Sequence, residues 1–313
     1  MKLCDIQSGQ LLSGFYLLRQ AVQRTTTAGK PYFSGVLTDQ SGSVDLKIWD
    51  YSGPITPADD GKVVWLQGRV SEFKGALQVT ADRIRLATGE DRFSLEDLVP
   101  SAPMDRELAR AQVVKMLSEM EDADYRAVCQ EMLRRHEAQF LTIPAAKSVH
   151  HGFLGGLLMH TCNMMRTARW LAVLYGDFLD KDLLLAGTFL HDFAKMREFS
   201  LSPVGLVSDY SVSGQLLGHL VMGAQEAAEV CRELNVPEEK SVLLQHLILS
   251  HHGEPEFGAA VVPQCAESEL LSYIDMIDSR MEIYRETLEK TPLGAFSDRV
   301  FALDNKRIFH HKG

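Results

Sequence analysis

Residues 183–195 read LLLAGTFLHDFAK: the apolar run from Leu183 to Leu190 is followed at once by His191 and Asp192, and three residues later by Lys195. Such a run predicts a buried helix with the histidine and the aspartate at its end. Adjacent residues on a helix point about 100° apart. Both side chains can therefore reach one cation only if it lies against this helix and other helices complete its coordination.

Further histidines and an aspartate in the same part of the chain supply candidates for that coordination. Imidazole and carboxylate are ligands that suit Mn, Fe, Co, Ni or Zn, and a helical bundle can project them onto one interior point. Any one of these histidines alone is more simply read as a hydrogen-bonded core residue. Burying five imidazoles and two carboxylates without a metal would be costly, so the set together predicts metal binding. Besides His191 and Asp192, the set contains His160, His219, His251, His252 and Asp275.

From residue 106 onward the apolar spacing is helical. A stretch with Gly and Ser over residues 199–213 predicts a short hairpin, and no internal repeat is present. The second part of the chain is therefore expected to be an all-α bundle. After a first helix that starts at residue 106, we expect helices at roughly 124–140, 152–175, 181–196, 215–234, 238–250 and 266–288.

Residues 10–87 show a different pattern, with short runs of β-branched and aromatic residues separated by glycines. Val44, Leu46 and Ile48 alternate with Asp45, Lys47 and Trp49, which places Trp49 on the same polar face as Lys47. About five short strands in this length predict a small closed β-barrel. The clearest strands are expected at residues 30–38, 43–49, 62–70 and 76–86.

The chain has 313 residues, about twice the commonest domain size, which favours two domains. With 45% apolar and 24% charged residues, its composition excludes collagen-like, disulfide-scaffold and largely disordered classes. A polar stretch with Gly89, Pro100 and Pro103 reads as a linker. We therefore expect a barrel domain at residues 1–88, a linker at 89–105 and a helical domain at 106–313.

Charge and cysteines bear on partners and compartment. The net charge is −10, but residues 1–88 hold ten Lys or Arg against eight Asp or Glu, so this part carries +2 and the remainder −12. The barrel could therefore face a polyanion locally. The five cysteines are odd in number, scattered and never in a C-x-x-C pair, as expected for reduced thiols. With no apolar stretch near the start that resembles a signal peptide or membrane span, we expect a cytoplasmic protein and no membrane partner.

Several segments resemble the HD-domain superfamily of metal-dependent phosphohydrolases. The matching segments are GGLLMHT (155–161), HDFAK (191–195), GH (218–219), SHHG (250–253) and YIDMID (273–278). Since the stretch from GKPY (29–32) through Trp49-Asp50 also looks like an OB-fold, nearly the whole chain resembles the YhaM-type 3′-to-5′ exoribonucleases. The resemblance implies an N-terminal OB-fold barrel followed by an HD-domain helical bundle. Phe193-Ala194 stands where many HD proteins carry Ile-Gly, and this departure removes no ligand.

The resemblance also implies a ligand set. A first metal ion would be held by His160, His191, Asp192 and Asp275. Asp192 would bridge to a second ion held by His219 and by His251, His252 or both. By resemblance we expect two divalent ions, with Mn²⁺ favoured.

Such a site suits phosphoryl chemistry, because a bound cation lowers the pKa of its water and two cations can clamp the attacking and leaving oxygens. Asp192 and Lys195 are the expected catalytic residues, and Lys195 would offset charge on the phosphate oxygens. Alternatively, Lys195 is a solvated lysine near a helix C-terminus.

For other candidate site residues, the sequence leaves a functional and a structural interpretation open. His151, next to His150, resembles a family feature that would contact the scissile phosphate, or both histidines face solvent at a helix N-terminus. Asp278 could orient a ligand or pair with Arg280 or Arg285 at the surface. His310 and His311 are expected in a solvated tail.

In the barrel, Tyr32, Lys47 and Trp49 are the candidates for substrate binding. Aromatic faces can stack on bases while a lysine contacts the nucleic-acid backbone, with Phe73 and Lys74 as a further pair. Alternatively, these aromatic side chains fill the core of the barrel.

The predicted metal site favours hydrolysis of a phosphate ester through a metal-activated water. The resemblance implies that the enzyme is a 3′-to-5′ exoribonuclease that acts on single-stranded RNA. The sequence does not distinguish single-stranded DNA from single-stranded RNA as the substrate. It is also compatible with a homo-oligomer. One alternative is a hydrolase of free nucleotides or cyclic dinucleotides with a regulatory barrel. The other is a single-strand-binding protein whose helical domain is structural.

Overall fold

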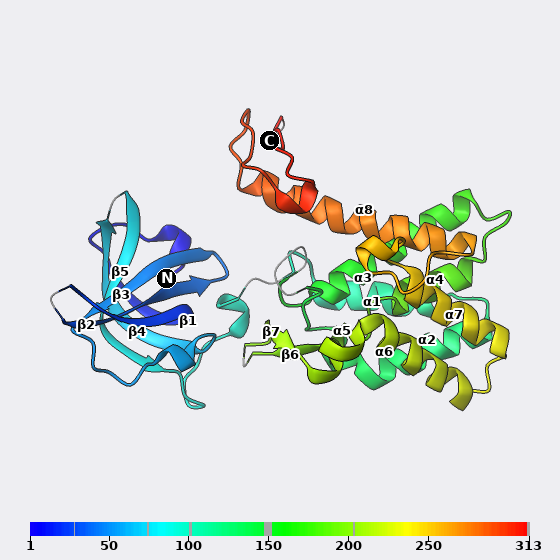
Figure 1. Cartoon of the computed structure of the whole chain (residues 1–313), viewed down its shortest axis with the longest axis horizontal. Coiled ribbons are helices and arrows are strands. Elements are labelled where there is room, and N and C mark those ends of the chain that lie inside the picture. The colour runs from blue at the N-terminus through cyan, green and yellow to red at the C-terminus, as the bar shows by residue number, and fades with distance from the viewer. Residues whose placement is uncertain (28, 74, 100–101, 147–151, 203, 312–313) are drawn as a thin grey trace. The chain divides into compact units, whose positions relative to one another are not determined.

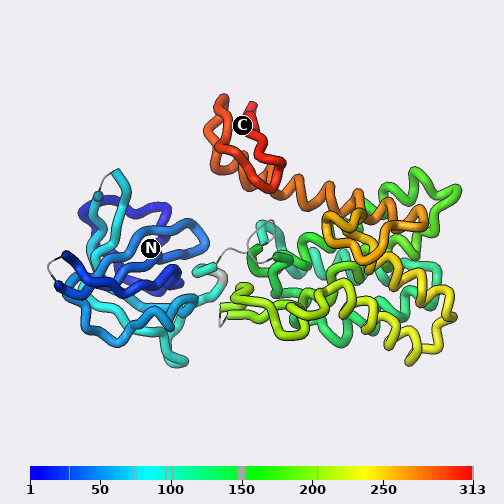
Figure 2. The backbone as a smooth tube through the Cα atoms, viewed as in Figure 1, coloured from blue at the N-terminus to red at the C-terminus, as the bar shows by residue number. Residues whose placement is uncertain are grey.

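The computed structural model describes the chain except for residues 28, 74, 100–101, 147–151, 203 and 312–313. It divides into two compact units, residues 1–101 with 201–208 and residues 102–200 with 209–313. Figures 1 and 2 show the first unit as a twisted β-barrel and the second as packed helices. The predicted class, an all-β domain followed by an all-α domain, is confirmed.

The first unit is a closed five-stranded barrel. Its strands pair in the order β1–β2–β3–β5–β4, and β4 closes the barrel onto β1. All pairings are antiparallel except that of β3 with β5, which is parallel. A five-stranded Greek-key barrel of this kind is an OB-fold. The strands are β1 (Leu11–Thr25), β2 (Pro31–Asp39), β3 (Gly42–Trp49), β4 (Val63–Phe73) and β5 (Ala76–Leu86).

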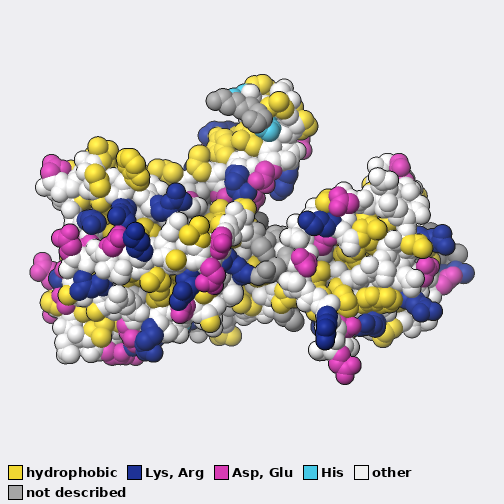
Figure 3. Space-filling model, turned by 180° about the vertical axis from the view of Figure 1, so that it is seen from behind, with side chains coloured by type: hydrophobic (Ala, Val, Ile, Leu, Met, Phe, Trp, Pro, Cys, Tyr) yellow, Lys and Arg dark blue, Asp and Glu magenta, His cyan; other side chains and the backbone are white. Residues whose placement is uncertain are grey.

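The alternation read from β3 decides which side chains face the barrel core. Val44, Leu46 and Ile48 are buried with Phe33 and other core residues, whereas Trp49 is 54% exposed. The prediction that Trp49 lies on the outer face is therefore confirmed. On the side of the molecule shown in Figure 3, acidic and basic side chains are interspersed rather than gathered by sign.

Part of the stretch expected as a linker is folded. A 3₁₀ turn, Leu95–Asp97, is followed by Leu98 and Val99, which are both buried. The Asp97 carbonyl accepts a hydrogen bond from the Gln40 amide at 3.0 Å. These residues therefore belong to the barrel unit.

Residues 102–313 form the expected helices and hairpin, and the hairpin includes residues 201–208, which the division above assigns to the first unit. The predicted 152–175 helix starts at Gly156, and the predicted 181–196 helix ends at Leu190, where a turn leads into the short α5. The elements are α1 (Arg106–Ser118), α2 (Ala123–Phe140), α3 (Gly156–Leu174), α4 (Lys181–Leu190), α5 (Lys195–Glu198), β6 (Phe199–Leu201), β7 (Val207–Tyr210), α6 (Val212–Glu233), α7 (Glu238–Ser250) and α8 (Ala266–Glu289).

Helix α4 lies at the centre of this unit, packed against α2, α3, α7 and α8. Every residue from Asp182 to Leu190 is buried. Asp180 caps the helix by accepting hydrogen bonds from the amides of Asp182 and Leu183, each at 2.9 Å. The turn after Leu190 is therefore held in the interior of the unit.

After α8 the chain folds into a small C-terminal lobe. Its two arms pair at Phe296 with Phe309 and at Val300 with Lys306. The His310 ring lies 2.6 Å from the Thr291 carbonyl, to which Nδ1 donates a hydrogen bond. The expectation that His310 belongs to a solvated tail is therefore wrong, because the lobe gives this ring a backbone partner.

Within the described part of the chain, we find no helix that combines the length and apolar character needed to span a membrane. The cysteines are all free, and Cys129, Cys162 and Cys231 are buried as small apolar side chains.

Gly187→Ala should lower the free energy of unfolding of the helical unit by about 1–3 kcal/mol. The added Cβ would lie 2.1 Å from Leu247 Cδ2, where α4 packs on α7. Thermal unfolding followed by circular dichroism measures the loss. Gly223→Ala is the matched control, because its Cβ would approach Ile248 Cγ2 only to 3.3 Å. Equal losses in the two variants would contradict this account of α4 packing.

Candidate metal centre

His191 and Asp192 lie in the turn that follows α4, with 0% and 2% of their surface exposed. The turn is held by amide hydrogen bonds from Phe193 to Leu190 and from Lys195 to Asp192, at 3.1 and 3.0 Å. Because α4 ends here, the side chains of His191 and Asp192 both lie in the same buried region beside the turn. The sequence pattern predicted their place at the helix end but not this turn.

Asp192 lies between two groups of imidazoles, each facing one of its carboxylate oxygens. Oδ2 is 3.4 Å from His191 Nε2 and 3.6 Å from His160 Nε2. Oδ1 is 3.3 Å from His219 Nε2 and 3.7 Å from His251 Nε2. The two oxygens thus face two separate sets of ring nitrogens, which come from α3, α6 and the turns after α4 and α7.

Asp275 of α8 joins the first set, with Oδ1 3.3 Å from His160 Nε2. His252 joins the second, and its ring centroid is 5.3 Å from that of His219. All seven residues expected as metal ligands therefore converge. Their possible ligand atoms lie within 4.8 Å of one another in three overlapping groups: His160, His191 and Asp275; His191, Asp192 and His251; His219, His251 and His252.

The Nδ1 atoms of four of these histidines are committed to oxygen acceptors. His191 donates to the Thr188 carbonyl at 2.7 Å and His251 to the Ile248 carbonyl at 2.8 Å. His160 lies 2.7 Å from Asp278 Oδ2, and His219 lies 3.1 Å from Glu198 Oε1. A ring that donates from Nδ1 directs its Nε2 lone pair at the centre, as metal-binding histidines do.

A second observation indicates that these nitrogen and oxygen atoms suit divalent cations. Among the described residues, four buried atoms of this centre have no hydrogen-bond partner: Asp192 Oδ1, His219 Nε2, His251 Nε2 and His252 Nδ1. Unpaired acceptors buried together are unfavourable unless a cation satisfies them. Imidazole nitrogens with carboxylate oxygens are the ligands that transition-metal dications prefer.

Burial keeps part of the histidine set neutral. It lowers the pKa of His251 to about 3 and also lowers the pKa of His252. Burial by itself would lower the pKa of His160 too, but Asp275 and Asp278 outweigh it and raise that pKa to about 10. This part of the centre therefore favours a positive charge, either a proton or a metal ion, and the two compete.

Lys195 lies beside the centre rather than in solvent. Its Nζ is 2.6 Å from Asp192 Oδ2, and 15% of its side chain is exposed. Burial would lower the pKa of Lys195, but Asp192 outweighs it and raises the pKa. Burial would likewise raise the pKa of Asp192, but Lys195 and His191 hold it well below its usual range. The interpretation of Lys195 as a solvated helix-end residue is wrong.

Glu198 is a residue of this site that the sequence interpretation missed. It is buried, and Oε1 accepts hydrogen bonds from the His219 amide at 3.0 Å and its Nδ1 at 3.1 Å. Gly218, with φ +72°, bends α6 just before His219. A usable signal was present, because Glu198 follows Lys195 by three residues and so lies on the same helical face.

Asp278 orients His160 through the contact described above, so of its two interpretations the structure favours the first. His150 and His151, the second of which was expected to contact the phosphate, lie outside the described residues.

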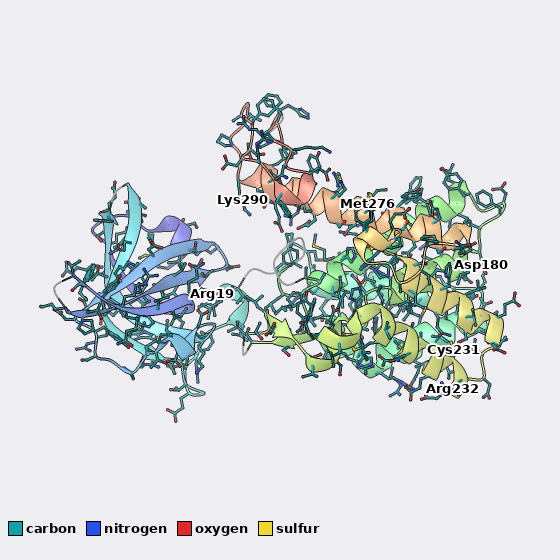
Figure 4. The ribbon with its side chains drawn as sticks, viewed as in Figure 1. Arg19, Asp180, Cys231, Arg232, Met276 and Lys290 are labelled. Carbon is teal, nitrogen blue, oxygen red and sulfur yellow. The ribbon has the colours of Figure 1, made fainter. Side chains whose placement is uncertain are left out.

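A cavity of about 590 Å³ opens onto the centre. Met276, labelled in Figure 4, lines it from α8. Other residues that line it are His160, Asp192, Lys195, Glu198, His219, His251, His252, Asp275, Arg280 and Asp304. The candidate ligands are therefore accessible to a substrate despite their burial.

In the barrel, the three candidate binding residues form one cluster. Tyr32 of β2 pairs with Trp49 of β3, and their ring centroids are 5.3 Å apart. Lys47 Nζ lies 5.6 Å from the Tyr32 ring centroid. The alternative that Trp49 fills the core is wrong. Phe73 is also exposed, whereas Lys74 lies outside the described residues.

Comparison with known proteins gives three kinds of match. An HD domain model matches residues 157–280, a range that contains all seven converging residues. The solved second OB-fold domain of replication protein A from Methanococcus maripaludis is 16% identical, covers 30% of this chain and 98% of that one, and has a TM-score of 0.22.

Curated relatives match over nearly the full length. The 3′-5′ exoribonuclease YhaM of Halalkalibacterium halodurans is 34% identical over 97% of this chain and 94% of its own. The protein of that name from Bacillus subtilis is 34% identical over 96% and 95%, and one from Listeria monocytogenes is 33% identical over 99% and 98%. Because the identity spans both the barrel and the helical unit, the chain belongs to the YhaM family of 3′-5′ exoribonucleases.

Proposed function

We propose that this enzyme is a divalent-metal-dependent exonuclease that shortens single-stranded RNA from its 3′ end in the cytoplasm. The observation that carries the proposal is the position of Asp192, whose two oxygens face two sets of histidine Nε2 atoms. The polarity and the RNA substrate are supported by relatives named 3′-5′ exoribonucleases, which are 34% identical to this chain over nearly its full length. In this proposal the barrel unit, which includes residues 95–99 of the expected linker, binds the strand, and the helical unit hydrolyses it.

We infer two divalent ions, with Mn²⁺ favoured. His160, His191, Asp192 and Asp275 would hold the first, and Asp192 with the second histidine set, His219, His251 and His252, would hold the other. When bound, the ions would supply an activated water at neutral pH and neutralise charge on the phosphate.

The reaction is hydrolysis of a phosphodiester. A water oxygen bonds to the phosphorus of the terminal linkage and gives up a proton, one P–O ester bond of that linkage breaks, and the leaving oxygen takes up a proton. Lys195 keeps its ammonium group beside Asp192 and in the cavity, where it would offset charge on nonbridging phosphate oxygens. We propose that His151 also contacts this phosphate.

The barrel would bind the strand through Tyr32, Lys47 and Trp49. Two neighbouring aromatic rings beside a lysine match what single-strand binding requires, namely stacking surfaces for bases and a cation for the backbone.

Asp192→Asn should reduce turnover about 10²–10³-fold or more while leaving the circular dichroism spectrum unchanged, because it removes the charge between the two histidine sets. Labelled RNA with a free 3′ end, incubated with Mn²⁺, measures turnover. ICP-MS on protein purified without chelator should show lower metal content in the variant.

Chelator should abolish wild-type cleavage, and added Mn²⁺ should restore a ladder that shortens from the 3′ end. Phosphate released from mononucleotides instead would favour a nucleotide hydrolase, and chelator-insensitive binding without turnover would favour a binding protein. Normal activity in Asp192→Asn would remove the catalytic assignment.

Glu198→Ala should weaken binding of one metal ion about 10–100-fold, because His219 loses the acceptor that orients its ring. Isothermal titration with Mn²⁺ measures the affinity. Glu198→Gln should be intermediate, since its amide oxygen can still accept the hydrogen bond. Glu233→Ala, which removes a surface partner of Arg135, is the control and should bind Mn²⁺ normally.

Trp49→Ala should weaken binding of a long single-stranded RNA by about 1–3 kcal/mol, the value of one base–aromatic stack. Cleavage of a dinucleotide should be unchanged, because in this proposal both of its nucleotides lie in the metal-centre cavity of the helical unit. Leu11→Ala, another exposed apolar side chain of the barrel, should leave both properties unaffected. Equal losses on long and short substrates would refute the stacking role.

A further inference from the structure

One wall of the metal-centre cavity is formed by α8. Two rows of its residues, spaced four apart, line the cavity: Ser272, Met276 and Arg280 in one row, and Asp275, Ser279 and Ile283 in the other. Asp275 belongs to the centre, whereas Arg280 lies five residues farther along the helix, about 7.5 Å along its axis. Arg280 therefore lies farther along the same cavity wall than the centre.

The charges along this cavity set Arg280 apart. The cavity lining among the described residues includes the carboxylates of Asp192, Glu198, Asp275 and Asp304, and the cations Lys195 and Arg280. Lys195 is held by Asp192 at 2.6 Å and is therefore committed to the centre. Arg280 is the lining cation that lies away from the centre, and a polyanion that extends along α8 would meet it.

The present partner of Arg280 is readily exchanged. Its Nη2 lies 3.2 Å from Asp304 Oδ2, and the two side chains are 33% and 65% exposed. Exposed pairs of this kind contribute little to stability. Asp304 would keep a partner after the exchange, because Lys306 Nζ lies 3.0 Å from the same oxygen. A phosphate offers Arg280 two oxygens for a bidentate contact, which is stronger than the single contact to Asp304.

The C-terminal lobe supplies that partner and part of the same wall. Ala302 and Asp304 line the cavity although they lie beyond the residues that match the HD domain model. Asp304 Oδ2 therefore occupies the position beside the Arg280 guanidinium that another oxygen anion could take in exchange.

We propose that Arg280 binds the phosphate one nucleotide upstream of the scissile linkage. This inference rests on the proposed exonuclease function. A 3′-hydroxyl end carries no phosphate downstream of the terminal linkage, so a second phosphate bound at this site belongs to the upstream nucleotide. The strand then extends from the centre along α8 towards Asp304.

The test compares a dinucleotide and a trinucleotide of RNA, both with 5′- and 3′-hydroxyl ends. The dinucleotide contains only the scissile phosphate, and the trinucleotide adds the upstream one. Arg280→Gln should lower kcat/KM for the 3′-terminal linkage of the trinucleotide about tenfold or more, and leave dinucleotide cleavage unchanged. Arg169→Gln is the control, because Arg169 forms a comparable exposed pair with Glu119 at 2.9 Å outside this cavity.

A methylphosphonate at the upstream linkage of the trinucleotide removes the negative charge of that phosphate. It therefore tests the same contact by changing the substrate rather than the protein. Wild type should lose about tenfold on this analogue, and Arg280→Gln should lose nothing further. A methylphosphonate penalty as large in the variant as in wild type would overturn the proposal, and so would an equal loss on both unmodified substrates.

The same experiment distinguishes failure of the proposed exonuclease function from failure of the role of Arg280. If wild type cleaves neither oligonucleotide with Mn²⁺, the exonuclease proposal fails, and the Kd values of the same oligonucleotides decide the role of Arg280. Weaker binding of only the unmodified trinucleotide by Arg280→Gln supports the contact, and unchanged binding overturns it.

Discussion

The helical unit is organised around one buried carboxylate. Asp192 is 2% exposed, and the free energy of burying such a charge is compensated only by close cations and hydrogen-bond donors. Lys195 supplies one cation, while the Nε2 atoms of His191 and His251 present lone pairs rather than protons when the neutral ring donates from Nδ1. Lone pairs against a carboxylate repel each other unless a positive charge lies between them. The centre is therefore arranged for cations.

The rest of the unit positions the ligands for that role. Backbone carbonyls of α4 and α7 orient His191 and His251, and the carboxylates of Asp278 and Glu198 orient His160 and His219. Because each ring is fixed by a partner on the side away from the centre, little reorganisation is needed when metal binds. Helix α8 adds Asp275 to the centre and extends the cavity wall towards the C-terminal lobe, so the same helix contributes both a candidate ligand and a wall of the cavity.

Features with a local cause were predictable. The alternation in β3 identified Trp49 as an outward residue, and the apolar run before His191 identified α4 as buried. Features with a non-local cause were not. The contact of Glu198 with His219 and the place of Asp304 on the cavity wall depend on elements that are distant in sequence, and no periodicity records such contacts. His310 was misread for the same reason, since its partner Thr291 lies across a lobe that only the folded chain forms.

The amino-acid sequence by itself determined the two-part organisation, the burial of α4 and the inventory of imidazoles and carboxylates, because spacing along a strand or helix decides which side chains share a face. The tertiary structure alone decided that residues as far apart as His160 and Asp275 meet at 3.3 Å, and that each oxygen of Asp192 faces a different pair of rings. The physical reason is that ring orientation follows from helix packing and from the acceptor bound at Nδ1, and both are set by contacts between helices.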